Sequence, residues 1–244
     1  ALTHNLTGLF AGAVLGTCLS FIIDWFISLK TFTWPRIPLK IFPTLNLLKQ
    51  GLPLGLAAAT ALLYTQIDTL ILGRFMSLQY VGWYSAAATL VFGLLQLNVP
   101  LMAAVYPALS RRHPQPQRFR ELIWQVSGII LAWTLPCIIL VWLLTRPILL
   151  ITFGADFLSA TVPLRLLSLL LPFAALSALL YKVLIVVNRQ KLYFAINLIG
   201  SLVNITANLI LIPILGMTGA AVSALITHIS LFATYTYFVK KSLT

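Results

Sequence analysis

Apolar residues run along this chain in long stretches that are separated by short polar connections. There are seven such stretches, at residues 8–28, 48–73, 83–109, 122–145, 163–187, 192–213 and 217–239. An α-helix rises 1.5 Å per residue, so about 20 residues cross the hydrocarbon core of a bilayer. Each stretch is long enough. The pattern therefore predicts an all-α, polytopic membrane protein with about seven transmembrane helices.

The composition supports lipid as the solvent and bears on the partners. Hydrophobic residues make up 60% of the 244 residues and charged residues only 8%, too apolar for a soluble domain of this size. The net charge of +12 could indicate nucleic-acid binding, but the basic residues gather in the short connections between apolar stretches. That distribution is typical of membrane proteins and suits anionic lipid headgroups. We expect membrane lipids as partners and no nucleic acid.

The charges of the connections predict the orientation. Lys and Arg are frequent in residues 29–47, 110–121 and 188–191 and in the C-terminal tail. They are rare in residues 1–7, 74–82, 146–162 and 214–216. Basic connections stay on the cytoplasmic side. The alternation predicts a cytoplasmic C-terminus and an N-terminus outside.

The 29–47 connection also predicts a domain boundary, because it contains Pro35, Pro38 and Pro43. We expect residues 1–28 to be the last helix of a missing N-terminal lobe. Residues 29–47 would then be a cytoplasmic linker, and residues 48–244 a six-helix lobe. The N-terminus outside is natural if an odd number of spans precedes residue 1.

Several polar side chains lie inside the predicted spans, and each has two interpretations. Asp68 either binds a cation, a proton or a local Arg in a cavity, or forms a structural contact between helices. Gln96 and Asn98, near Pro100, either satisfy backbone groups freed by the proline or line a polar path. Arg165 and Lys182 either snorkel to the surface or offer charge to an anionic substrate.

The sixth span shows the clearest polar pattern. Asn197, Ser201, Asn204 and Asn208 follow the spacing i, i+4, i+7, i+11 and share one helix face. Unpaired polar groups are too costly in hydrocarbon for this face to meet lipid. It contacts either other helices or a hydroxyl-rich substrate.

The sequence contains no pattern typical of catalysis. It has no paired-carboxylate motif, no metal-ligand cluster and no glycine-rich phosphate loop, and its connections are short and nearly free of acids. We expect neither catalytic residues nor a cofactor, and this disfavours a membrane enzyme of glycan assembly.

Five segments, together with the Asn-bearing helix, form a further pattern along the chain. The segments are 47–55 (LLKQGLPLG), 66–75 (QIDTLILGRF), 81–87 (VGWYSAA), 146–154 (RPILLITFG) and 211–221 (LIPILGMTGAA). In their order and spacing they resemble the polysaccharide transporter family, the oligosaccharide flippases of the multidrug/oligosaccharidyl-lipid/polysaccharide exporter superfamily. The resemblance covers about residues 45–240.

The resemblance implies two six-helix lobes around a cavity that opens alternately to each side. The expected function is translocation of a polyprenyl-pyrophosphate-linked oligosaccharide across the bacterial inner membrane, for surface polysaccharide synthesis. The missing lobe, or a second copy, would complete the transporter. Alternatives are a cation-coupled multidrug exporter of the same superfamily and a non-transporting scaffold of a glycan-assembly complex. The candidate substrate path comprises Asp68, Arg74, Gln96, Asn98, Arg165, Lys182, Asn197, Ser201, Asn204 and Asn208.

Overall fold

A computed structural model of the chain describes residues 2–31, 51–52, 55–56, 59 and 66–243. The chain divides into two compact units, Ala1–Leu47 and Leu48–Thr244. In the first unit, helix α1 runs Leu2–Thr31 and contains the predicted span 8–28. The predicted linker therefore begins inside this helix, and its residues from 32 onwards lie outside the described residues.

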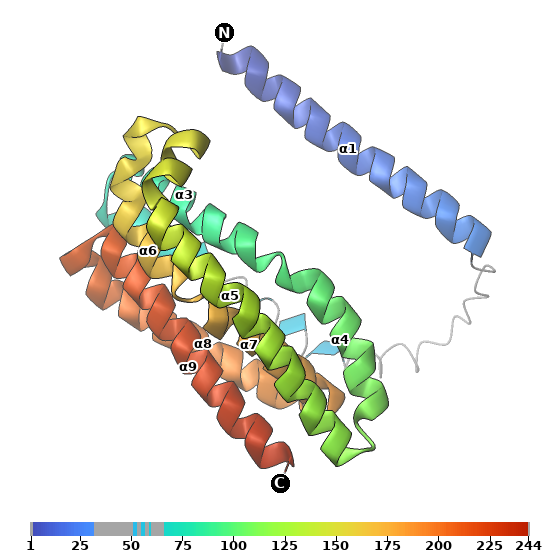
Figure 1. The fold of residues 1–244 in the computed structure, drawn as a ribbon. Helices are drawn as coiled ribbons and strands as arrows, with labels where there is room; N and C mark the ends of the chain where they lie inside the picture. The colour runs from blue at the N-terminus through green and yellow to red at the C-terminus, as the bar shows by residue number, and fades with distance from the viewer. Residues whose placement is uncertain (1, 32–50, 53–54, 57–58, 60–65, 244) are drawn as a thin grey trace. The chain divides into compact units, whose positions relative to one another are not determined.

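The second unit is helical throughout its described residues 66–243, apart from short turns (Figure 1). Residues 66–75 form the described end of the predicted second span, most of which lies outside the described residues. The elements that follow are α3 Leu78–Leu95, α4 Asn98–Arg112, α5 Pro116–Thr152, the 3₁₀ helix η1 Ala155–Ala160, α6 Thr161–Ser168, α7 Leu171–Val186, α8 Gln190–Leu215 and α9 Met217–Leu243.

Among the described residues, four helical segments are long and apolar enough to cross a membrane. They are Leu78–Arg112, Pro116–Thr152, Gln190–Leu215 and Met217–Leu243. A fifth is present if Ala155–Ser168 and Leu171–Val186, which are bent by 42° at their break, are counted as one span. The chain is an all-helical, multi-pass membrane protein.

Two predicted spans are broken, each shortly before a proline. Helix α3 ends at Leu95, five residues before Pro100, and α6 ends at Ser168, four residues before Pro172. Proline cannot donate a hydrogen bond to the carbonyl four residues earlier, and its ring collides with that carbonyl. The kink expected near Pro100 is present. The span predicted at 163–187 is bent by 42° at its break for the same reason.

Helix α5 is longer than the apolar stretch 122–145 that predicted it. It includes Arg118 and Arg120 in its first turns and Arg146 near its end. Long basic side chains reach water from a helix that extends past the bilayer, so charge does not end the helix there. The connections predicted at 110–121 and 146–162 are therefore largely helical.

Helices α8 and α9 form an antiparallel hairpin, and small residues let them approach closely. A Cβ atom at Gly219 would overlap the carbonyl oxygen of Leu211, and one at Gly200 would collide with the side chain of Leu231. Small residues at helix contacts serve this purpose in membranes. Because of this tight pairing, the face of α8 that carries Asn197, Ser201, Asn204 and Asn208 points into the bundle.

The charge-rich and charge-poor ends of the second unit are opposite one another. Arg120, at the start of α5, donates to the carbonyl of Leu243 at the end of α9, and Figure 1 shows the start of α5 and the end of α9 at the same end of the bundle. Met76 lies against Gly216, and η1 contacts α3. The charge-poor turns therefore meet at the other end.

Candidate functional site

The carboxylate of Asp68 lies at the meeting point of three helical segments. Only 4% of the residue is exposed. Its Oδ2 accepts a hydrogen bond from the Tyr84 hydroxyl at 2.9 Å. Its Oδ1 accepts from Nδ2 of Asn204 at 2.9 Å and from Nδ2 of Asn208 at 2.6 Å. Residues 66–75, α3 and α8 thus converge on one acidic group.

The amides of α8 extend this cluster to α9. Nδ2 of Asn204 also donates to Oγ1 of Thr227 at 3.2 Å, and its backbone carbonyl accepts from Ser223 at 3.2 Å. Nδ2 of Asn208 donates to Oδ1 of Asn204 at 3.1 Å. We call Asp68, Tyr84, Asn204, Asn208 and Thr227 the Asp68 cluster.

Charge is the unusual property of this cluster. All three hydrogen bonds that the described residues give the carboxylate come from neutral donors. Neutral donors stabilise an anion but leave its net charge in place, and a buried unpaired charge is expensive at membrane depth. A bound proton or a small cation would remove that cost.

The cluster also offers oxygen atoms to such a ligand. Oδ1 of Asn208 is buried without a hydrogen-bond partner, although Nδ2 of the same side chain contacts Asp68. Carboxylate, amide and hydroxyl oxygens are the ligands that hard cations prefer. In the described part of the chain, no three His, Cys, Asp or Glu side chains are placed so that they could hold a metal ion. Any cation here would therefore be held mainly by neutral oxygens.

The other two polar candidates of α8, Asn197 and Ser201, lie on the same buried face. Asn197 donates to the Tyr235 hydroxyl on α9 at 2.8 Å and to its own helix at Tyr193. Ser201 donates to the carbonyl of Asn197. The ring of Tyr193 stacks between those of Tyr181 and Tyr235. Thus Asn197, like Asn204, contacts another helix.

The three basic candidates occupy different environments. Arg165, half-buried on α6, donates to Oγ1 of Thr145 and to the carbonyl of Trp142, each at 3.2 Å. Lys182, half-buried on α7, places Nζ 5.1 Å from the ring centres of both Tyr106 and Tyr181. Arg74 is exposed at the end of residues 66–75. The structure does not bring these cations together.

Gln96 and Asn98 flank the break between α3 and α4 but differ in burial. Gln96 is exposed. Asn98 is 5% exposed, and its Nδ2 donates to the carbonyl of Ala175 on α7 at 3.4 Å. Oδ1 of Asn98 has no partner. Asn98 therefore joins α4 to α7 instead of repairing the backbone of its own helix.

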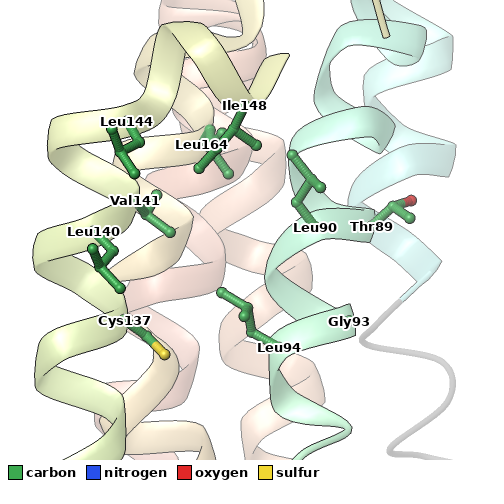
Figure 2. A pocket seen from close by; sticks show the side chains of 10 residues that line it. All are labelled: Thr89, Leu90, Gly93, Leu94, Cys137, Leu140, Val141, Leu144, Ile148 and Leu164. Carbon is green, nitrogen blue, oxygen red and sulfur yellow. The ribbon is translucent and has the colours of Figure 1, made fainter. Parts of the chain in front are cut away.

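Two cavities are lined by described residues of the second unit, and none of the ten candidate residues lines either of them. One has a volume of about 450 Å³ and lies between α3 and α5. Figure 2 shows its wall of leucines, with Thr89 and Cys137 as the only lining groups that carry oxygen or sulfur on the side chain. It suits hydrocarbon and not a sugar. The other, of about 590 Å³, lies among α5, α7 and α9.

The substrate path predicted from the sequence lacks three members of this buried network. They are Tyr84, Thr227 and Tyr235. A signal was present for Tyr84, which lies within the apolar stretch 83–109 that is predicted to span the membrane, because a buried tyrosine hydroxyl needs a partner. That partner, Asp68, is 16 residues away on another helix.

Comparison with models of known protein families identifies the family of the chain. A family model described as polysaccharide biosynthesis protein matches residues 1–162. The chain belongs to this family. None of the curated proteins searched matches it.

A solved structure has the same fold as this member of the polysaccharide biosynthesis family. It is a lipid II flippase, MurJ, in an inward closed conformation, with a TM-score of 0.69 and 21% sequence identity. The alignment covers 91% of this chain and 50% of the flippase chain. The chain therefore spans half the length of that transporter.

Proposed function

We propose that this chain is the C-terminal half of a flippase that moves a polyprenyl-pyrophosphate-linked oligosaccharide across the bacterial inner membrane for surface polysaccharide synthesis. Membership of the polysaccharide biosynthesis family carries the proposal. The fold shared with half of a lipid II flippase supports it. The role is transport and not catalysis.

The proposed architecture has seven spans in this chain. Helix α1 is the last helix of an N-terminal lobe, residues 29–47 are the cytoplasmic linker, and residues 48–244 are the six-helix second lobe. Half coverage of the flippase chain supports a partner lobe, supplied by the missing half or by a second copy. The contact of Arg120 with Leu243 supports a common, cytoplasmic side for the two basic segments.

In the proposed mechanism, the Asp68 cluster couples the cycle to a proton or a monovalent cation. Its carboxylate joins residues 66–75 to α3 and α8, and α9 contacts the same amides. Binding or release of a positive charge there changes the hydrogen bonds that hold these segments together. Such a change can bias the lobe between two packings.

The remaining candidates are proposed to meet the substrate where the lobes face one another. Cationic Arg74, Arg165 and Lys182 would attract the pyrophosphate, because charge-assisted hydrogen bonds to phosphate are strong. Amides and hydroxyls, among them Gln96, Asn98, Asn197 and Ser201, would contact sugars. The buried amides would first have to exchange their present partners for the substrate.

A cation-coupled multidrug exporter is the second candidate, and the apolar cavity between α3 and α5 favours it. Such a cavity accepts an apolar drug as readily as a lipid tail. The two functions differ in the consequence of gene loss. Only loss of a flippase strands lipid-linked sugar on the cytoplasmic leaflet.

The test is deletion of the whole gene in its own host. Surface polysaccharide is measured, and lipid-linked oligosaccharide is located by its accessibility to a glycosidase in sealed right-side-out and inverted vesicles. We expect lost surface polysaccharide and accumulation in the cytoplasmic leaflet, both restored by the wild-type gene. Normal polysaccharide without accumulation would overturn the proposal. Loss of the lipid-linked sugar itself would instead support a scaffold for its synthesis.

A further inference from the structure

A groove on the second unit ends in two basic residues at the charge-rich end. Helices α5 and α9 both pack on α7 and form the walls of this groove, which has a volume of about 590 Å³. We call it the α5–α7–α9 groove. Arg120 on α5 and Lys240 on α9 line it at the end where Arg120 reaches the carbonyl of Leu243.

The walls beyond these cations are suited to hydrocarbon. Most of the other lining residues are large and apolar, among them Trp124, Leu180 and Phe232. The hydroxyls of Ser127 and Thr236 each donate to the carbonyl four residues earlier in the same helix, at 2.8 Å. Their protons are therefore already satisfied, and an acyl chain can lie against them without leaving a donor unpaired.

The charged end of the groove is suited to an anion. None of the described residues that line it is acidic. Glu121 follows Arg120 directly, but neighbouring residues on a helix point in different directions and Glu121 is not among the lining residues. Trp124, which is 78% exposed one turn along α5, has the amphipathic ring that favours the headgroup level.

The length of the groove matches one leaflet. Along α5 it extends from Arg120 to Leu131, about 16 Å at the helical rise of 1.5 Å per residue. Half of the hydrocarbon core is about 15 Å thick. An acyl chain of a phospholipid fits this depth with its headgroup at the cations, whereas a polyprenyl chain is far longer and would leave the groove.

We infer that the α5–α7–α9 groove binds an anionic phospholipid of the cytoplasmic leaflet. Its phosphate lies between Arg120 and Lys240, and one acyl chain lies on α7 between α5 and α9. Basic pockets between transmembrane helices on the cytoplasmic side recognise such headgroups. The lipid bridges α5 and α9 at their cytoplasmic ends. The inference rests on the proposed orientation but not on the transported substrate.

The test measures lipid retained by the full chain purified in detergent. Native mass spectrometry counts bound palmitoyl-oleoyl phosphatidylglycerol or phosphatidylcholine as each is titrated. We expect one tightly held phosphatidylglycerol and weaker phosphatidylcholine. Arg120→Gln with Lys240→Gln should weaken phosphatidylglycerol binding about twenty-fivefold, the product of about fivefold per basic residue. Added phosphatidylglycerol should also raise the unfolding temperature of wild type more than that of this variant.

Two further variants separate the site from its surroundings. Ser127→Phe fills the groove but keeps both cations, and it should abolish the tight phosphatidylglycerol. Arg111→Gln with Arg112→Gln removes two exposed charges outside the groove and should leave retention unchanged. Equal retention of the two lipids by wild type, or equal loss in both double variants, would overturn the inference. So would displacement of phosphatidylglycerol by polyprenyl phosphate at equal concentration. None of these outcomes depends on transport.

Discussion

Substitution of Asp68 can separate its charge from its hydrogen bonds. In Asp68→Asn, the side-chain oxygen can accept from Asn204 and Asn208 as Oδ1 does now. The new amide nitrogen can donate to the Tyr84 hydroxyl, which at present donates to Oδ2. Asp68→Ala keeps none of these contacts and leaves the Tyr84 hydroxyl without the partner that it has now.

The magnitudes follow from these contacts. A charged aspartate at the centre of a membrane helix costs about 2.5–3.5 kcal/mol on insertion scales, so Asp68→Asn should be at least as stable as wild type. An orphaned buried donor costs about 1–3 kcal/mol, which Asp68→Ala incurs at Tyr84 in addition to the cavity. We expect the free energies of unfolding of the two variants to differ by about 2 kcal/mol or more, which is a difference of about thirtyfold or more in the folded/unfolded ratio.

The assay is reversible unfolding in mixed micelles, followed by circular dichroism, for wild type, Asp68→Asn and Asp68→Ala. Asp156→Asn, which removes an exposed acid on η1, is the matched control and should change little. In the deletion strain, Asp68→Asn should insert normally yet fail to restore surface polysaccharide, because an amide cannot take up the coupling charge.

Two results would refute this reasoning in different ways. If Asp68→Asn unfolds as easily as Asp68→Ala, the buried charge is not the main cost at this position. If Asp68→Asn restores full polysaccharide, the cluster is a structural contact between helices and the coupling role is wrong.

Three other predictions concern packing, the Asn-bearing face and orientation. Gly219→Ala should lower the free energy of unfolding by about 1–3 kcal/mol, because the backbone of α8 blocks the new methyl. Gly82→Ala is the control, because its new methyl would have nothing within 4 Å, and it should leave the free energy of unfolding unchanged or higher. Equal effects of the two substitutions would contradict the close approach of α8 and α9. Asn204→Leu should insert into the membrane but restore less surface polysaccharide than wild type in the deletion strain. Full restoration would show that Asn204 serves only to pack the helices. In a cysteine-free background, an impermeant maleimide should label a cysteine at Gln115 only from the cytoplasm and one at Ser77 only from outside, and the reverse labelling would overturn the orientation.

Much of the helical architecture could be predicted from local pattern. The spans 192–213 and 217–239 lie inside α8 and α9, since a long apolar stretch satisfies its backbone only as a helix in lipid. The break near Pro100 followed from the missing proline donor. The break before Pro172 obeys the same rule, but Pro136 and Pro147 lie within the uninterrupted α5, so neighbouring packing decides which prolines break a helix.

The sequence by itself determined that the Asn-bearing face of α8 avoids lipid, because helical spacing aligns its four polar side chains and hydrocarbon cannot solvate them. It could not say what that face meets. Asp68 lies 136 positions before Asn204, and no periodicity connects residues so far apart. Only the tertiary structure decided that Asp68, Tyr84 and the two asparagines share one site, because close packing of α8 on α9 and on residues 66–75 sets their distances.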